Sequence, residues 1–262
     1  MTALRICLFG SIRIARADWA SELKITRAVQ ALLAYLLLYR HRIHPREVLA
    51  NLFWGDHPEE RARSCLSTAL WRLRCALEPG DTTRGTYLVT TPMGEVGFNH
   101  KSDYWLDVAV FEDQASRIAG KPIQVMDADD AHQLENSIQL YVGELLEGFY
   151  DDWALRERER LRSLHLKSLA HLMRYYGYHG AYEHAITCGQ NILNHDPLRE
   201  EIHREVMRLY LQSGQRAQAI RHYKSCCQIL DAELGIPPME ETRMLYHQIL
   251  QGTGDQQTQC TP

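Results

Sequence analysis

Long apolar runs are missing from this sequence of 262 residues. The longest candidate, residues 29–39, is far shorter than the roughly 18 residues that a membrane-spanning helix needs, and it contains Gln30. The N-terminus also lacks the basic segment, apolar stretch and small-residue cleavage site of a secretory signal. We therefore expect a cytoplasmic protein that does not contact a membrane.

Cysteine and histidine occur, but not in patterns typical of disulfide frameworks or metal sites. The seven cysteines are scattered, and none forms a C-x-x-C. Cys226 and Cys227 are adjacent, and neighbouring cysteines rarely meet disulfide geometry, so we expect reduced core thiols rather than a redox pair. The 13 histidines contain neither H-x-x-x-H nor H-E-x-x-H, which favours solvated or capping side chains and no metal site.

Common catalytic and nucleotide-binding motifs are absent as well. The sequence contains no G-x-x-x-x-G-K-[ST], no G-x-G-x-x-G and no G-x-S-x-G. Nothing therefore points to an enzyme or to a bound cofactor.

The net charge of −4 conceals an uneven distribution along the chain. Residues 1–100 hold 13 of the 29 Lys and Arg and 9 of the 33 Asp and Glu residues, a formal +4, which leaves −8 for residues 101–262. The length allows one or two domains and a core that needs no disulfide or metal. Together with the charge asymmetry, it predicts two modules with different partners.

The N-terminal half has the pattern of a small α+β domain. Residues 4–14 alternate apolar and polar around Gly10, which predicts two short strands or one bent strand. Three helices are expected next, over residues 26–39 (Thr26 as N-cap), 45–53 and 58–77 (Asp56 or His57 as N-cap). Residues 87–99 predict a hairpin that turns at residues 92–94. This order predicts a winged helix-turn-helix, with the third helix as the recognition helix.

The third helix has two contrasting faces. Leucines at every third or fourth position form an apolar stripe: Leu66, Leu70, Leu73 and Leu77. The opposite face and its flanks carry Arg61, Arg63, Ser64, Thr68, Trp71, Arg72, Arg74 and Cys75. Guanidinium groups can donate bidentately to guanine in the major groove, and hydroxyls can reach bases or phosphates. A solvated basic helix on a small domain would show the same pattern, so the residues alone leave both interpretations open.

A resemblance favours the first interpretation. Residues 69–80 resemble the end of the recognition helix in OmpR-type winged helices, with Trp71 in place of a small residue. Trp54 matches a tryptophan usual at the end of the second helix and is expected to pack in the core. The hairpin tip departs from the family because it has no Arg or Lys, and Arg84 and Lys101 are the nearest basic residues. The DNA-binding candidates are therefore Arg61, Arg63, Ser64, Thr68, Trp71, Arg72, Arg74 and Arg84.

The turn between the second and third helices is acidic. Its residues Asp56 and Glu59 are candidate contacts for RNA polymerase, as the OmpR resemblance implies, although helix capping would explain them too. No receiver module precedes the first strand, so we do not expect aspartyl phosphorylation within this chain as an input.

The C-terminal half is predicted to be helical, without a convincing strand. A connector and a helix are expected over residues 103–119, and further helices over 130–144, 153–177, 181–194, 198–212, 215–234 and 238–251. Residues 173–186 and 207–220 align at an offset of 34 with six identities. This period and its helix–turn–helix pattern are the signature of tetratricopeptide repeats. Gly189 stands where an aromatic is usual, and residues 130–165 are expected to supply a third unit.

Two further stretches carry a more specific resemblance. Residues 140–162 and 234–250 resemble the bacterial transcriptional activation domain, and residues 105–112 resemble its opening segment. The matching positions are Gly143, Leu145, Leu146, Gly148, Trp153, Glu157, Arg158 and Leu161, then Leu234, Gly235, Pro238, Glu241, Thr242, Leu245 and Tyr246. Among the aromatics we expect core packing for Trp153, Tyr176, Tyr210 and Tyr246. We expect a solvated, salt-bridged helix face for residues 156–160.

An OmpR-type winged helix fused to this domain is the architecture of SARP-type transcriptional activators, which the chain resembles over residues 4–251. The predicted fold is mainly α, with a winged helix-turn-helix over residues 1–100, a tetratricopeptide-like helical domain over 104–252 and a flexible tail over 253–262. The resemblance implies an activator that binds repeats in promoter DNA and recruits RNA polymerase, with a second copy of the chain as a candidate partner. Two alternatives stay open: a tetratricopeptide-type adaptor for a protein, and the front part of a longer regulator with an ATPase.

Overall fold

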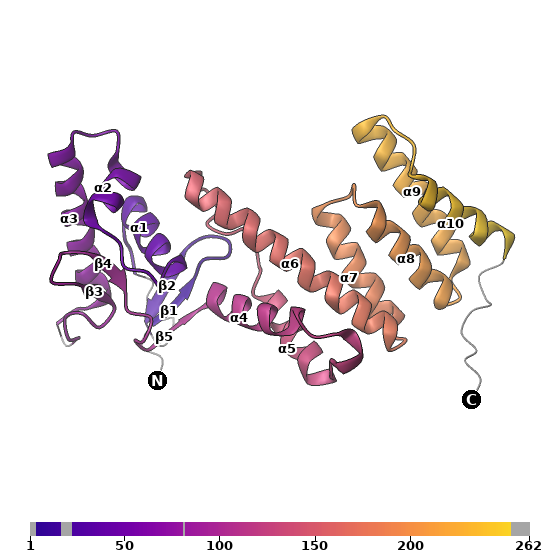
Figure 1. The fold of residues 1–262 in the computed structure, drawn as a ribbon, viewed down its shortest axis with the longest axis horizontal. Coiled ribbons are helices and arrows are strands. Elements are labelled where there is room, and N and C mark those ends of the chain that lie inside the picture. The colour runs from indigo at the N-terminus through magenta and orange to yellow at the C-terminus, as the bar shows by residue number, and fades with distance from the viewer. Residues whose placement is uncertain (1–3, 17–22, 81, 253–262) are drawn as a thin grey trace. The chain divides into compact units, whose positions relative to one another are not determined.

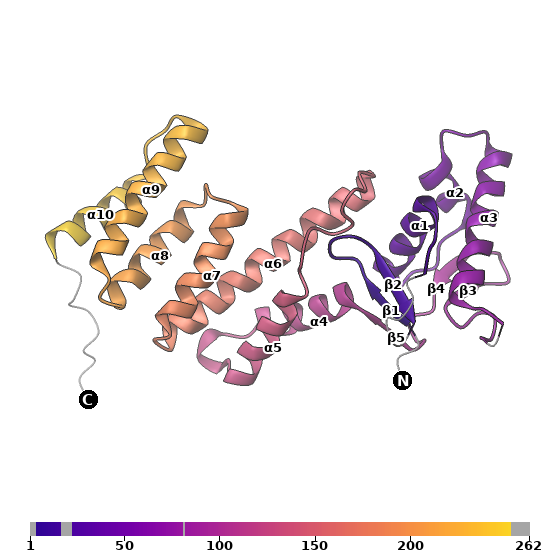
Figure 2. The same ribbon diagram turned by 180° about the vertical axis from the view of Figure 1, so that it is seen from behind.

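The computed structural model describes residues 4–16, 23–80 and 82–252, so the predicted tail lies outside the described residues. The chain divides into two compact units: unit 1 comprises residues 1–112 and 140–161, and unit 2 the remainder. Figures 1 and 2 show short strands near the N-terminus and helices along the rest of the chain. The mainly helical fold class is confirmed. Within the described ranges, no helix is both long and apolar enough to cross a membrane.

The sheet of unit 1 joins segments that lie far apart in the sequence. Strand β1 (Leu4–Cys7) pairs antiparallel with β2 (Arg13–Arg16) and parallel with β5 (Tyr104–Leu106). The two-strand interpretation of residues 4–14 is thus confirmed. The expectation of no strand in the C-terminal half was wrong at β5, because three residues gain strand geometry only from a partner about 100 positions away.

Asp107 fixes the end of β1 to the start of helix α4 (Asp107–Ala119). Its carboxylate accepts hydrogen bonds from the backbone N–H groups of Leu8 (2.9 Å), Phe9 (3.0 Å) and Val108 (2.7 Å). Burial raises the pKa of Asp107 to about 6, and the three N–H groups oppose this rise. A single buried carboxylate therefore satisfies backbone donors of two elements at once.

Three helices and a hairpin follow in unit 1 as predicted. The helices are α1 (Arg27–Leu38), α2 (Arg46–Trp54) and α3 (Glu59–Leu77), and the hairpin pairs β3 (Leu88–Thr90) with β4 (Val96–Phe98). Thr26 occupies the N-cap position of α1. Helix α3 begins after Pro58, so the expectation of Asp56 or His57 as its N-cap was wrong. The leucine stripe of α3 is buried as expected.

The segment between α5 (Ala128–Gln139) and α6 (Asp152–Tyr178) is irregular and packs in unit 1. The helix expected to reach residue 144 therefore ends at residue 139. Arg158 of α6 holds this segment, because its guanidinium donates to the carbonyls of Leu145, Leu146 and Phe149, each at 2.9 Å. The expectation that residues 156–160 form a solvated face was wrong at Arg158, whose side chain is only 13% exposed.

The predicted internal repeat has a structural counterpart in unit 2. Gly180 lies between α6 and α7 (Tyr182–His195), and Gly214 between α8 (Glu200–Gln212) and α9 (Arg216–Leu234). Both glycines have a positive φ, +73° and +75°, which favours glycine. The residue after each glycine donates its N–H to a tyrosine carbonyl, Tyr176 at 2.8 Å and Tyr210 at 2.7 Å. A last helix, α10 (Glu240–Gln251), packs against α9.

Several polar or aromatic side chains are placed differently from expectation. Three histidines are buried rather than solvated: His44, His165 and His203. The ring of His203 lies 2.9 Å from the Pro197 carbonyl and 3.0 Å from the ring of His222. Burial, with the adjacent His203, lowers the pKa of His222 to about 4. Trp153 is buried as expected, whereas four other aromatics expected in the core are half-buried: Trp54, Tyr176, Tyr210 and Tyr246.

Gly189 explains the departure from the tetratricopeptide pattern, and it yields a prediction. A Cβ at this position would lie 2.5 Å from Cγ2 of Val206 on α8 and 3.1 Å from Sδ of Met173 on α6. We expect Gly189→Ala to lower the free energy of unfolding by about 1–3 kcal/mol, because overpacking outweighs the gain in helix propensity. Urea denaturation followed by circular dichroism measures this, with Gly120→Ala as the control because nothing lies within 4 Å of its Cβ position. Equal stability of the two variants would contradict the close α7–α8 approach.

Candidate nucleic-acid interface

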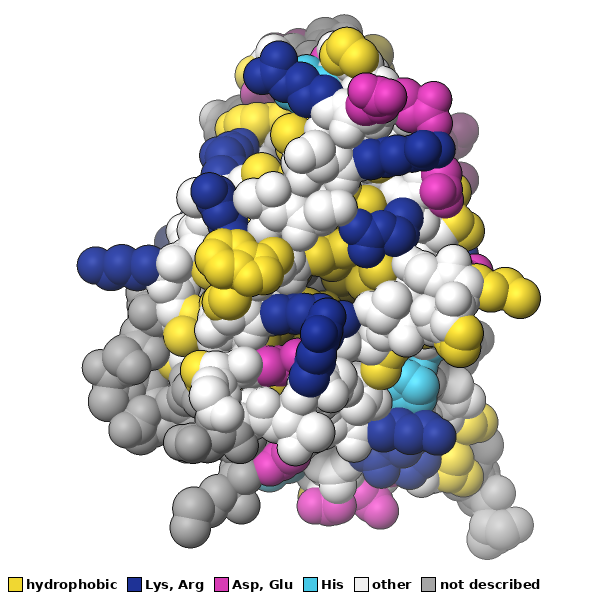
Figure 3. All heavy atoms as spheres, turned by 90° about the vertical axis from the view of Figure 1, so that its left-hand side faces the viewer, with side chains coloured by type: hydrophobic (Ala, Val, Ile, Leu, Met, Phe, Trp, Pro, Cys, Tyr) yellow, Lys and Arg dark blue, Asp and Glu magenta, His cyan; other side chains and the backbone are white. Residues whose placement is uncertain are grey.

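Helix α3 buries its leucine stripe and turns its polar face to solvent. Seven of the eight sequence-predicted DNA-binding residues are exposed, namely Arg61, Arg63, Ser64, Thr68, Trp71, Arg72 and Arg84, and Arg74 is half-buried. Figure 3 shows this face, where Lys and Arg side chains surround a hollow with a hydrophobic wall. The predicted residues on α3 and Arg84 thus form an accessible surface of unit 1.

The polar face of α3 has two edges and a centre. At about 100° per residue, Arg61, Thr68 and Arg72 lie along one edge. Arg74 and Ser67 lie along the other edge, which faces α2 and the hairpin. Trp71 stands between the edges with 65% of its surface exposed.

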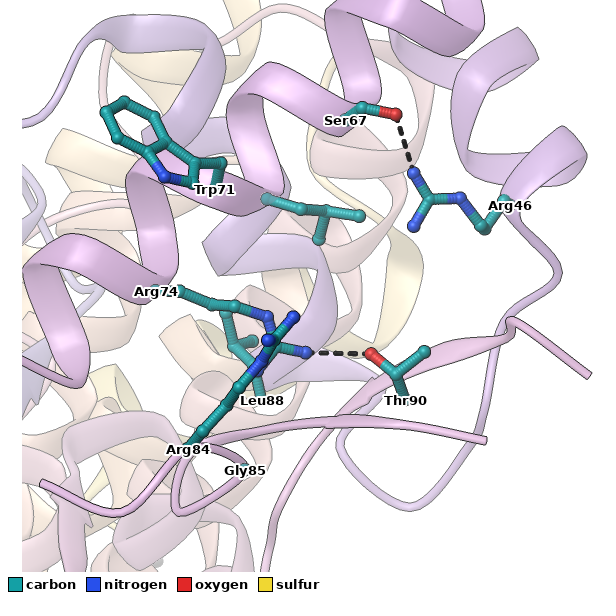
Figure 4. A pocket seen from close by; sticks show the side chains of 9 residues that line it. Arg46, Ser67, Trp71, Arg74, Arg84, Gly85, Leu88 and Thr90 are labelled. Atoms are coloured by element: carbon teal, nitrogen blue, oxygen red, sulfur yellow. Dashed lines mark hydrogen bonds between the residues drawn. The ribbon is translucent and has the colours of Figure 1, made fainter. Parts of the chain in front are cut away.

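A hollow of about 390 Å³ lies between α2, α3 and the hairpin. Arg46 of α2 reaches across it and donates from Nη2 to Oγ of Ser67 at 2.7 Å. Arg74 of α3 donates from Nη2 to Oγ1 of Thr90 at 2.7 Å, and Arg84 lines the same hollow (Figure 4). Arg46, Arg74 and Arg84 thus line one concave site, which we call the arginine hollow. Three guanidinium groups at one site favour the binding of an anion.

The sequence interpretation did not find Arg46, Ser67 and Thr90. Arg46 lies in the first turn of α2, and its contact with Ser67 spans 21 positions. Local periodicity contains no signal for such a contact, because it depends on how α2 packs against α3. Only the OmpR resemblance, which makes α2 the neighbour of the recognition helix, could have directed attention to it.

Glu78 ties the end of α3 to the segment that leads into the hairpin. Its side chain is only 2% exposed and lies 3.3 Å from Arg74. Its carboxylate accepts the N–H groups of Gly85 (3.1 Å), Tyr87 (2.8 Å) and Leu88 (2.9 Å). Burial alone would raise the pKa of Glu78, but these hydrogen bonds and the Arg74 charge hold it below its usual value. Glu78 therefore fixes both Arg74 and the backbone beside Arg84.

Of the two candidate polymerase contacts, Asp56 lies in the turn between α2 and α3, and Glu59 is the first residue of α3. Asp56 and Glu59 are exposed. Glu59 pairs with Arg63 at 2.5 Å, one turn along α3. The structure thus brings Arg63 together with the acidic turn rather than with the arginine hollow.

Glu78 yields a prediction about stability and pH. We expect Glu78→Ala to lower the free energy of unfolding at pH 7 by about 2–4 kcal/mol, because three backbone donors lose their acceptor. Since the folded pKa of Glu78 is depressed, its contribution is present above the pKa of the unfolded chain and is lost as pH falls through the folded pKa. Urea denaturation at pH 7 and pH 3 should therefore show a smaller difference from wild type at pH 3.

The exposed Glu60→Ala is the matched control for Glu78→Ala. We expect it to change stability by less than about 0.5 kcal/mol. A Glu78→Ala variant as stable as this control would show that the carboxylate does not hold the hairpin.

Comparisons with known proteins show which proteins this chain is similar to. The transcriptional regulatory protein MoaR1 of Mycobacterium tuberculosis (strain ATCC 25618 / H37Rv) is 28% identical over 240 residues, which cover 84% of this chain and 71% of the relative. MoaR1 of Mycobacterium bovis (strain BCG / Pasteur 1173P2) is 26% identical over 237 residues, with the same coverage. The solved structure of Mycobacterium tuberculosis EmbR in complex with a low affinity phosphopeptide has the same fold, with a TM-score of 0.76 at 18% identity. That match covers 96% of this chain and 66% of the EmbR chain.

Residues 106–250 match the family model described as bacterial transcriptional activator domain. This match covers more than half of the chain. The chain therefore belongs to the bacterial transcriptional activator domain family, and it is a transcriptional regulator of the SARP type.

Proposed function

We propose that this regulator acts in the bacterial cytoplasm by binding promoter DNA, without catalysis, and that α3 enters the major groove. The observation that carries the proposal is the exposed polar face of α3, bordered by the arginine hollow. We assign DNA binding to residues 1–100 and the activator domain to residues 104–252. The exposure of Arg61 and Arg72 favours this function over the adaptor alternative, which needs a neutral or covered face.

Base readout is assigned to the edge of α3 that carries Arg61, Thr68 and Arg72. A guanidinium can donate two hydrogen bonds to guanine, and a threonine methyl can pack against the methyl group of thymine. Trp71, at the centre of the face, supplies apolar contact with base edges. Thr68 already donates its hydroxyl proton to the Ser64 carbonyl at 3.0 Å, which leaves its methyl group and a lone pair for DNA.

Phosphate binding is assigned to the arginine hollow. Arg46, Arg74 and Arg84 come from three different elements, so a backbone phosphate between them would fix the position of α3 in the groove. The formal charge of +4 on residues 1–100 is modest for a DNA-binding module. We therefore propose that two copies bind adjacent direct repeats and that contact with RNA polymerase adds further affinity. The exposed Asp56 and Glu59 are the proposed polymerase contacts.

The readout assignment predicts the behaviour of Arg72→Ala. We expect its Kd for DNA from upstream of its own coding region to rise about 10-fold, the loss of one bidentate base contact. Arg84→Ala should weaken binding to all sequences alike and reduce the salt dependence of log Kd by about one unit. Fluorescence anisotropy over a salt series measures both effects.

The matched control is Arg221→Ala, which removes the same charge from an exposed position on α9. We expect its Kd to stay within about twofold of wild type. The proposal is wrong if Arg72→Ala binds as well as this control, or if wild-type affinity does not depend on salt.

The polymerase assignment predicts that DNA binding and activation can be separated. We expect the double variant Asp56→Asn and Glu59→Gln to bind promoter DNA as wild type does. In vitro transcription with purified RNA polymerase should fall several-fold, because the acidic contact is lost. The neighbouring Glu60→Gln is the control, and unchanged activation by the double variant would remove the acidic turn from the polymerase interface.

A further inference from the structure

A second hollow, of about 320 Å³, lies in unit 2 between α5, α6 and α7. Its size is at the lower end of the range for small-molecule sites, about 300–1,000 Å³. Two carboxylates line it, Glu135 of α5 and Glu183 of α7, and none of its described lining residues is Lys or Arg. Its lining therefore favours a positively charged ligand.

The floor and one wall of this hollow are apolar or aromatic. Leu169 and Leu172 are 3% and 2% exposed, and Cys188 is 9% exposed. The rings of Tyr176 and His184 form the wall, with their centroids 5.2 Å apart and their planes tilted by 36°. An apolar body would fit against the two leucines, and an adjacent cation would lie near the aromatic ring of Tyr176.

Glu135 is held in place for such a contact. The hydroxyl of Tyr176 donates to Oε1 of Glu135, and Oε2 lies 3.9 Å from Nδ1 of His132. The Glu135 side chain is 35% exposed, so its carboxylate is partly desolvated yet accessible. Glu183 is fixed in a similar way, because Nε2 of Gln215 donates to its Oε1 at 2.7 Å. Both carboxylates are thus oriented by neighbours that carry no permanent positive charge.

Cys188 does not provide covalent chemistry at this site. Burial and the nearby Glu135 raise the pKa of its thiol to about 12, so the thiolate is scarce at neutral pH. The hollow is therefore suited to reversible binding.

We propose that this hollow binds a small organic cation, with its ammonium group against Glu135 and its apolar body on Leu169 and Leu172. Such a ligand would be an effector bound to the activator domain, and the proposal does not depend on DNA binding. The ligand class is a compact primary or secondary amine with an aromatic or aliphatic body.

Three indole probes whose side arms end in groups of different charge test this proposal on the full chain. They are tryptamine (cation), indole-3-ethanol (neutral) and indole-3-propionate (anion), titrated with ligand-observed NMR. We expect tryptamine to bind with a Kd on the order of 1 mM or tighter. Indole-3-ethanol should bind at least about 10-fold more weakly, and the anion should not bind, since only a cation gains from Glu135.

Glu135→Gln is the informative variant, because its amide oxygen can still accept the Tyr176 hydroxyl and preserve the fold. We expect it to bind tryptamine no better than indole-3-ethanol. Glu233→Gln, an exposed carboxylate on α9, is the matched control and should bind as wild type does. The proposal is overturned if tryptamine does not bind, if the three probes bind equally, or if Glu135→Gln retains the preference for the cation.

Discussion

The proposed DNA-binding surface depends on one buried carboxylate, that of Glu78. It lies at the C-terminal end of α3, where it accepts three backbone N–H groups from the segment before the hairpin and pairs with Arg74. These contacts connect the segment before the hairpin to the C-terminal end of α3. The Glu78 carboxylate thereby fixes two walls of the arginine hollow. One wall is Arg74 with Thr90, and the other is Arg84 with Gly85. Asp107 has the same role at the other end of unit 1, where it ties β1 to α4.

The proposed function separates specificity from affinity on the two edges of α3. Arg61, Thr68 and Arg72 are exposed and do not line the hollow, and we propose that they read bases. Arg46, Arg74 and Arg84 surround it and are suited to a phosphate, which positions the helix but carries no sequence information. The hairpin tip, residues 92–94, contains no Lys or Arg, and its Met93 is 90% exposed. The proposed reader is therefore the helix rather than the wing, and two copies on repeated sites would compensate for its small net charge.

The sequence was informative where structure follows from local spacing. From Leu66 to Leu77, a leucine recurs every three or four residues. This spacing identified the buried stripe of α3, and the exposed face of the helix followed from the position of the stripe. The 34-residue offset placed Gly180 and Gly214 at equivalent turns, as their positive φ angles confirm. The family itself followed from motifs in a fixed order, and residues 106–250 match its model.

Contacts between distant segments could not be predicted in this way. Strand β5 is three residues long and exists because β1 pairs with it. Arg158 lies in a run of alternating charges that is typical of a solvated helix, yet it meets three carbonyls of a segment 9 to 13 positions earlier. Arg46 joins the candidate site only through the packing of α2 against α3. In all three cases the structure of the strand or the role of the side chain is set by tertiary packing, which local periodicity does not encode.

We propose above all that α3 reads a repeated DNA sequence. Selection of bound fragments from the genomic DNA of the source organism, with purified full-length chain at physiological salt, tests it most directly. We expect wild type to enrich fragments that share a short direct repeat, and Arg72→Ala to lose the preference at one position of each repeat while the repeat spacing is kept. Fragments without a shared repeat, or the same motif recovered by both proteins, would contradict it.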